Sequence, residues 1–315
     1  MIHNTLLDTI LGSIVEQLES DLSRCGFMYH IFWRTKSERS IKEKLGKKAE
    51  GYRRDGKKMQ DLLALRITLY FSDDVEILHQ YLRAQNNYLD ETTDTDDDRT
   101  FCPKRLNLVM RVPDEWQKNM TDYLQREYAE CADLLDTTYE IQIRTILSEG
   151  WHEVEHDLRY KCQEDWADFR DESRLLNGIF ATLESSEWSM LTLFDKMAYS
   201  FYKKRNWTNM LRNKMRLRFM DKGLSESVNN YLTAHPNIGK SLYKVRRKKV
   251  IDFVLNNDFQ FPLQYDTVMH LLNRVEINDS ELKALEKAPL RVMLDKIIEE
   301  KEKRDGAHKE YEASR

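Results

Sequence analysis

The chain has 315 residues, of which 50 are lysine or arginine and 54 are aspartate or glutamate, so its formal net charge is only −4. Its 41% hydrophobic residues suffice for the core of one large or two small domains, and the charge balance excludes a generally polybasic or polyacidic protein. Four scattered cysteines without a CxxC pair argue against a zinc ribbon or a disulfide framework and favour a cytoplasmic location. Neither a signal peptide nor an apolar stretch of about 18 residues is evident, so we expect no membrane partner.

The first half of the chain mixes helix and strand patterns. Apolar residues between Leu6 and Leu18 recur at helical spacing, and Gly26 can end that helix. Strands are predicted at about 28–33, 62–71, 106–112 and 138–144. Helices are predicted after residue 37 and at about 74–84, 114–131 and 146–160. This mixture predicts an α+β fold, with a mixed sheet flanked by helices.

The second half is predicted to be mostly α-helical. Residues 170–204 and 206–222 have helical periodicity, and 279–312 predict one or two charged helices whose end is solvated or frayed. We therefore expect one domain at 1–165, including the N-terminal helix, and a helical region at 166–315. The aromatic segment 188–207 is expected to form core or an interface, which leaves a neutralising protein partner or a homo-oligomer open.

Charged residues stand where a buried sheet should exclude them. Asp61 precedes the apolar strand, Arg66 lies inside it, and Glu140, Gln142 and Arg144 share one face of the strand at 138–144 because side chains alternate. Two carboxylates from adjacent strand ends can hold Mg²⁺ against a nucleoside triphosphate. Cations that can neutralise its phosphates are Arg34, Lys36, Lys44 and Arg66. Ordinary surface ion pairs are the alternative interpretation.

Four segments resemble motifs of the RelA/SpoT synthetase family, and they occur in the family's order. These are RTKSERSIKEK at 34–44, DLLALRI at 61–67, YEIQIRT at 139–145 and WHEVEHDLRYK at 151–161. The resemblance implies a nucleotidyltransferase-like core that moves the β,γ-pyrophosphate of ATP to the 3′-hydroxyl of GDP or GTP, which is the (p)ppGpp synthesis of the stringent response. It implies that ATP is bound by Arg34, Lys36, Ser40, Lys44 and Arg66. It also implies that Asp61 and Glu140 hold Mg²⁺, with Glu140 as general base.

The acceptor side departs from the family pattern. Family members that use GDP or GTP have a Gly-Tyr-x-Ser-x-His stretch, whereas residues 98–110 here read DRTFCPKRLNLVM. Phe101 can stack on a base in place of the tyrosine, and Lys104 or Arg105 can meet phosphate. The resemblance places Gln142 near the acceptor nucleotide, and we expect Arg144 and His156 on the same side.

Two alternatives to a guanine nucleotide synthetase stay open. Some relatives are translation-blocking toxins that pyrophosphorylate the 3′-terminal adenosine of tRNA, and such a toxin would belong to a toxin–antitoxin pair. Basic clusters that can neutralise RNA phosphates lie at 47–58, 203–205, 212–218 and 240–249, although charged helix faces are more often simply solvated. The other alternative is a catalytically silent domain that binds nucleotides for regulation.

A second motif overlaps the last of the family segments. His152-Glu153-Val154-Glu155-His156 matches the H-E-x-x-H pattern of zinc proteases, in which two histidines share a helix face. The pattern is short, and no third ligand is singled out. His156-Asp157 also matches the doublet of HD hydrolases, but the further histidines and aspartates of that fold are missing. We therefore expect neither a zinc protease nor a hydrolase.

Overall fold

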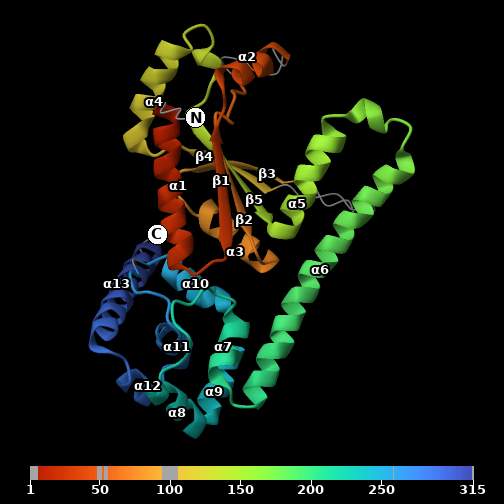
Figure 1. Cartoon of the computed structure of the whole chain (residues 1–315). Coiled ribbons are helices and arrows are strands. Elements are labelled where there is room, and N and C mark those ends of the chain that lie inside the picture. The colour runs from red at the N-terminus through yellow and green to blue at the C-terminus, as the bar shows by residue number, and fades with distance from the viewer. Residues whose placement is uncertain (1–5, 48–51, 53–55, 94–105, 258, 314–315) are drawn as a thin grey trace. The chain divides into compact units, whose positions relative to one another are not determined.

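The computed structural model describes residues 6–47, 52, 56–93, 106–257 and 259–313 (Figure 1). Its internal contacts divide the chain into two compact units, one formed by Met1–Ser20 with Met28–Trp188 and one by Asp21–Phe27 with Ser189–Arg315. We call them the sheet unit and the helical unit. The division between the two units lies within helix α6 (Arg170–Lys203). The domain boundary expected at residue 165 remains a prediction, because these units are defined by contacts.

Within its described residues, the sheet unit contains five strands in the order β1-β2-β5-β4-β3. The strands are β1 (Tyr29–Thr35), β2 (Leu63–Leu69), β3 (Tyr88–Thr93), β4 (Leu106–Arg111) and β5 (Thr138–Thr145). Only β2 and β5 pair in parallel, and the other three pairs are antiparallel. The structure thus confirms the predicted mixed sheet. It also contains β3, an edge strand that the sequence analysis did not predict.

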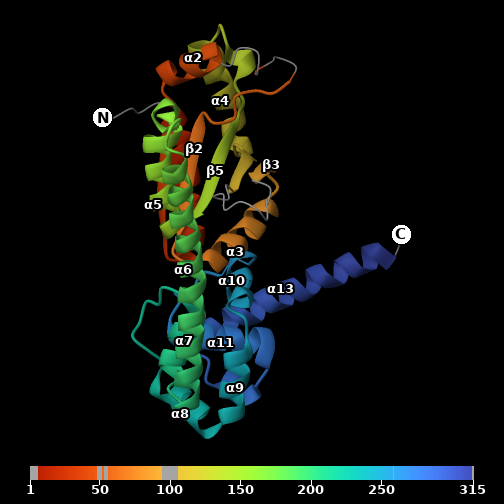
Figure 2. The same cartoon turned by 90° about the vertical axis from the view of Figure 1, so that its right-hand side faces the viewer.

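Alternation along the central strands separates a buried face from a polar face. In β5 the side chains at Tyr139, Ile141 and Ile143 are buried, while Glu140, Gln142 and Arg144 are only half-buried. The helices of this unit are α1 (Leu6–Arg24), α2 (Glu38–Lys47), α3 (Ser72–Arg83), α4 (Asp114–Glu127) and α5 (Ile146–Glu155). Helices α1 and α4 lie on one side of the sheet and α5 on the other (Figure 1), and Figure 2 shows α5 next to β2 and β5.

The predicted helix at 146–160 is regular only in its first two thirds. Thr145 caps α5 by accepting a hydrogen bond from the Ser148 amide, which satisfies a free donor of the first turn. His156–Tyr160 then continues as a π-helical turn. Because π turns shift the side chains that follow, this change of pitch decides which residues face the sheet.

The helical unit confirms the predicted helical C-terminal region. Its helices after α6 are α7 (Trp207–Met215), α8 (Glu226–Ala234), α9 (Pro236–Lys244), α10 (Arg247–Leu255), α11 (Tyr265–Leu272), α12 (Ser280–Ala284) and α13 (Ala288–Ala313). The helix expected at 206–222 ends early because Arg216 adopts a left-handed conformation with φ 47°. The charged helices predicted at 279–312 are α12 and α13, and α13 continues to Ala313. No helix among the described residues has the length and apolar character needed to cross a membrane.

Candidate active site

The polar face of the sheet collects the charged residues singled out in the sequence. The parallel register of β2 and β5 places Ala64 opposite Glu140 and Arg66 opposite Gln142. The antiparallel register of β4 and β5 adds Asn107 opposite Gln142. Three adjacent cavities open on this face, and each is lined by side chains from several strands.

The first cavity brings the two predicted catalytic carboxylates together. Asp61, just before β2, and Glu140, on β5, line one space of about 270 Å³. Its cationic and aromatic lining consists of Lys44, Tyr52, Lys57 and Lys58. We call it the carboxylate cavity. The sequence analysis grouped Lys57 and Lys58 with an RNA-binding cluster, whereas here they face the same space as the acids.

Two lysines hold one oxygen of Asp61. Lys36 Nζ and Lys44 Nζ donate to Asp61 Oδ2 at 2.5 and 2.6 Å. Burial alone would raise the pKa of Asp61, but the two ammonium groups outweigh it and hold this pKa below its ordinary value. Burial has the larger effect on Lys36, whose pKa is lowered, while Asp61 and Tyr52 outweigh burial at Lys44 and raise its pKa. Asp61 is therefore a carboxylate at neutral pH.

The other oxygen of Asp61 points to a missing ligand. Asp61 Oδ1 is buried and has no hydrogen-bond partner within the described part of the chain. A buried carboxylate oxygen without a partner is costly unless a cation or water meets it. Glu140 accepts a hydrogen bond from Gln142 Nε2 at 2.8 Å and lines the same cavity. The two acids therefore fit a metal ion that takes its remaining ligands from water and phosphate.

The type of metal follows from the donor set. Among the residues that the structure describes, no group of three or more histidines, cysteines or acids is arranged to hold a metal. Structural and catalytic zinc sites need at least three such protein ligands, whereas Mg²⁺ is usually held by one or two carboxylates together with substrate phosphates. The carboxylate cavity thus fits Mg²⁺ that arrives with a nucleotide.

The second cavity lies between two arginines. It has a volume of about 390 Å³ and is lined by Arg34 of β1, Arg66 of β2 and the exposed aromatic side chains Phe32 and Trp33, among others. Arginine faces and aromatic rings both stack on flat conjugated rings. We call it the arginine cavity. Gln142 lines the cavity as a polar residue, and its Oε1 accepts a hydrogen bond from Arg66 Nε at 3.0 Å.

Two glutamates of α5 bind Arg66. Arg66 Nη1 donates to Glu149 Oε1 and to Glu153 Oε1. Glu149 also accepts from Arg144 Nη1 at 2.9 Å through its second oxygen, so it bridges two arginines. Burial works against the charge of Arg66, but the two glutamates outweigh it and raise its pKa. Burial and the charge of Arg66 lower the pKa of Arg144, although Glu149 opposes both.

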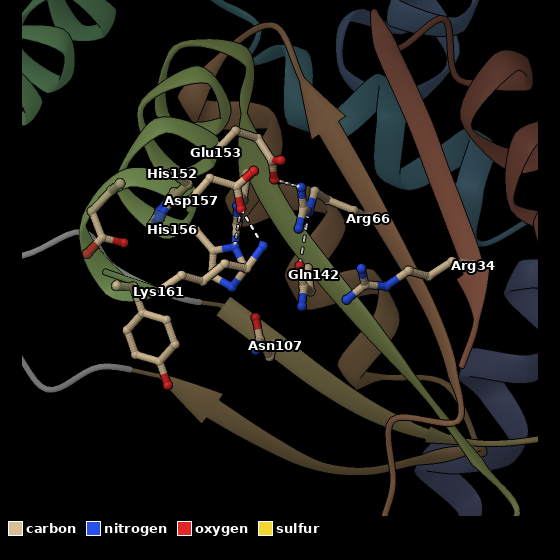
Figure 3. A pocket seen from close by; sticks show the side chains of 12 residues that line it. Arg34, Arg66, Asn107, Gln142, His152, Glu153, His156, Asp157 and Lys161 are labelled. Atoms are coloured by element: carbon tan, nitrogen blue, oxygen red, sulfur yellow. Dashed lines mark hydrogen bonds and ion pairs between the residues drawn. The ribbon is translucent and has the colours of Figure 1, made fainter. Parts of the chain in front are cut away.

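The third cavity joins three of the predicted acceptor-side residues. Gln142, Arg144 and His156 line a space of about 430 Å³, which Figure 3 shows between the sheet and α5 with its π turn. His156 stacks on Tyr160 with ring centroids 5.6 Å apart and interacts with Asp157. Arg34 and Arg66 line it as well, so this cavity shares both arginines with the arginine cavity. The remaining lining residues are Asn107, His152, Glu153, Glu155, Asp157, Tyr160 and Lys161.

The H-E-x-x-H pattern is used for packing and for arginine binding. His152 is buried, with ring centroids 5.5 and 6.2 Å from those of Trp151 and Phe180. Glu153 pairs with Arg66, so it is not placed to activate water. This arrangement explains the motif without a zinc ion.

Some predicted site residues are not brought to these cavities. The Ser40 hydroxyl accepts a hydrogen bond from the Ser37 hydroxyl at the start of α2 and lines none of the three. Phe101, Lys104 and Arg105 lie outside the described residues. Conversely, the sequence did not reveal Glu149 as an arginine partner, because one of its partners, Arg66, comes from a strand far away in the chain.

Comparisons with known proteins match part of the chain. Residues 33–165, less than half of the chain, match the family model described as the region found in RelA / SpoT proteins. This part of the chain is therefore similar to RelA / SpoT proteins. This match contains the four motifs and most of the residues that line the three cavities. None of the curated proteins is similar enough to the chain to count as a match.

Several solved structures are similar to part of the chain. Small alarmone synthetase 1 from Bacillus subtilis is 21% identical, with a TM-score of 0.41, over 59% of this chain and 93% of that protein. A GTP pyrophosphokinase family protein from Streptococcus pneumoniae is 22% identical, with a TM-score of 0.44, over 58% of this chain and 87% of that protein. Small alarmone synthetase 1 bound to its product pppGpp is 21% identical, with a TM-score of 0.42, over 59% and 93% of the two chains.

Proposed function

We propose that the chain is an ATP-dependent pyrophosphokinase that transfers the β,γ-pyrophosphate of ATP to the 3′-hydroxyl of GDP or GTP. The observation that carries this proposal is the carboxylate cavity, in which Asp61 and Glu140 face three lysines and Asp61 Oδ1 has no hydrogen-bond partner among the described residues. The similarity to RelA / SpoT proteins and the four motifs support the same activity.

Each of the three cavities suits a different part of the two substrates. The arginine cavity, with Arg34, Arg66 and two aromatic rings, suits the adenine base of ATP. Lys44, Lys57 and Lys58 then neutralise the charge of its phosphates in the carboxylate cavity. The third cavity, with Arg144, His156 and Lys161, receives the acceptor nucleotide.

The transfer itself needs one proton acceptor and one leaving group. The acceptor's 3′-oxygen attacks the β-phosphorus of ATP, the bond from that phosphorus to the α–β bridging oxygen breaks, and AMP leaves. Glu140 takes the proton of the 3′-hydroxyl, and Gln142, which donates to Glu140, keeps that carboxylate oriented. When Mg²⁺ is bound by Asp61 and Glu140, it neutralises phosphate charge and lowers the pKa of the hydroxyl.

The test is to follow label from γ-³²P ATP in the presence of GDP, GTP or deacylated tRNA. We expect a guanosine product that carries the label together with an equal amount of AMP. Label that moves only to tRNA would replace the guanine nucleotide by the alternative acceptor, the 3′ end of tRNA. Release of labelled phosphate or pyrophosphate without any labelled acceptor, or no reaction at all, would contradict the proposal and favour a silent nucleotide-binding domain.

The role of Glu140 is tested by Glu140→Gln, which keeps the shape and removes the base. We expect transfer to fall by at least about 100-fold, the usual contribution of a general base. A matched control is Glu115→Gln, because Glu115 is an exposed glutamate on α4 outside the three cavities. Retained activity in Glu140→Gln, with the control active, would remove Glu140 from the mechanism.

A further inference from the structure

The basic residues of the chain are concentrated in one segment of the helical unit. Residues 196–249 contain 15 lysines and arginines but only two acidic residues, Asp221 and Glu226, although the whole chain has a net charge of −4. This segment lies entirely within the helical unit. A local excess of this size attracts polyanions even when the protein as a whole is slightly acidic.

Three tyrosines form a cluster in the middle of this segment. Tyr199 and Tyr202 near the end of α6 meet Tyr243 of α9. Tyr202 and Tyr243 are stacked, with ring centroids 5.1 Å apart and an interplanar angle of 17°, and Tyr199 lies 5.8 Å from Tyr243. Tyr199 is exposed and the other two rings are half-buried. The cluster therefore presents aromatic surface to solvent.

The tyrosine cluster packs against a buried tryptophan. Trp207, at the start of α7, is fully buried and its ring lies 6.3 Å from that of Tyr202. Gly239 of α9 lies so close to the indole that an added Cβ atom would overlap it. Helix α9 is thus held tightly against α7, which fixes Tyr243 at its other end. A rigid aromatic surface loses little conformational entropy when it binds a ligand.

Two lysines lie beside the cluster, and two more are close to Tyr243 in the sequence of α9. Lys203 Nζ lies 5.7 Å from the centre of the Tyr199 ring, and Lys214 Nζ lies 5.3 Å from that of Tyr243. One carboxylate is near, because Asp195 lies 3.5 Å from Lys214. Lys240 and Lys244 on α9 are exposed, and neither forms an ion pair with any residue that the structure describes. The surface keeps a net positive charge after these pairs are counted.

We propose that this tyrosine–lysine surface, formed by Tyr199, Tyr202, Lys203, Lys240, Tyr243 and Lys244, binds RNA. Lysines neutralise a phosphate backbone, and exposed aromatic rings stack on bases, a combination typical of single-stranded nucleic acid sites. An anionic membrane would use the lysines, but its headgroups offer no flat conjugated ring for the tyrosines. The proposal does not rest on the pyrophosphokinase activity, since none of these residues belongs to the three cavities.

The test measures binding of the full-length chain to a fluorescein-labelled, single-stranded RNA of about 20 nucleotides by fluorescence anisotropy over a range of salt concentrations. Lys240→Glu/Lys244→Glu should weaken binding at least tenfold at low salt and reduce the salt slope by about 0.7 for each lost phosphate contact. The control is Lys287→Glu/Lys296→Glu, which reverses two exposed lysines elsewhere in the helical unit. It should change binding by less than about twofold, as expected for residues that touch no phosphate.

The aromatic contribution is tested separately. Tyr243→Phe keeps the ring and should bind like the parent chain, whereas Tyr243→Leu should bind several-fold more weakly, with circular dichroism showing that both remain folded. Equal loss in both lysine pairs would mean that only overall charge matters, and no loss in any variant would mean that this surface is not used. Binding to phosphatidylserine vesicles but not to RNA would make it a lipid site; each of these outcomes overturns the proposal. Unchanged transfer from ATP to GDP in Lys240→Glu/Lys244→Glu separates this result from a failure of the active site.

Discussion

Glu149 should contribute more to the stability of the sheet unit than Glu153, the other glutamate that binds Arg66. The side chain of Glu149 is only 13% exposed, and it accepts hydrogen bonds from two arginines, Arg66 and Arg144. Glu153 binds Arg66 as well, but its side chain is 54% exposed. Glu149→Gln and Glu153→Gln therefore make the same chemical change to two glutamates one helical turn apart, in different environments.

The expected magnitudes follow from burial. Removing one partner of a fully buried ion pair costs about 3–5 kcal/mol, because the other charge is left without compensation. Glutamine still offers one acceptor to the arginines and the site is not completely buried, so we expect Glu149→Gln to lower the free energy of unfolding by about 2 kcal/mol. Loss of an exposed pair costs about 0–1 kcal/mol, and Glu153→Gln should fall in that range.

The measurement is urea unfolding followed by circular dichroism at neutral pH, in dilute buffer and in about 1 M NaCl, where the Debye length is about 3 Å. Salt should remove the effect of Glu153→Gln and leave most of that of Glu149→Gln, since partly buried pairs are screened less. The reasoning is refuted if the two variants are equally destabilised, or if the Glu149→Gln effect also vanishes in salt.

Two further predictions concern Gly239 and His270 of the helical unit, and the first compares Gly239 with Gly178 on the part of α6 that belongs to the sheet unit. Gly239→Ala should cost about 1–3 kcal/mol because its methyl group would overlap the Trp207 ring, whereas Gly178→Ala, with open space around it, should gain about 0.5–1 kcal/mol; thermal melts that rank them otherwise would be contrary to this packing. Burial lowers the pKa of His270 and outweighs the opposite effect of two nearby acidic residues. The stability that the neutral His270 contributes is therefore fully present above the unfolded-state pKa of about 6.5, and it is lost as the pH falls through the folded-state pKa. Urea midpoints measured from pH 7 downwards should fall more steeply for the parent than for His270→Gln, and parallel curves would rule the histidine out.

The elements that could be predicted are those whose burial is evident from the pattern of apolar residues in the sequence. Strands β2 and β5 were predicted because one is an apolar run and the other alternates, and both are central in the sheet. Strand β3 was not predicted, because its sequence YLDETT has little apolar content and its stability comes from pairing with β4. Helices α8 to α11 have only eight or nine residues each, too few for a clear helical period.

The same distinction applies to the candidate site. Asp61 and Glu140 were noticed because acids are rare at the ends of buried strands, and the structure brings them to one cavity. Glu149 gave no such signal, since a glutamate on a helix is ordinary until the fold places two arginines against it. Lys57 and Lys58 were grouped with their neighbours in sequence, and only the path of the chain into β2 shows that they face the acids.

In the candidate site, Gln142 connects the arginine cavity to Glu140 in the carboxylate cavity through hydrogen bonds. Arginine only donates hydrogen bonds, so Arg66 fixes the Gln142 amide with its oxygen toward Arg66 and its nitrogen toward Glu140. Because Glu149 in turn holds Arg66, a continuous series of hydrogen bonds connects α5 to the proposed general base. Residues that share such a network are not energetically independent. The losses of activity in Gln142→Leu and Glu149→Gln should therefore be less than additive in the double variant, and additive losses would show that Glu140 is oriented without them.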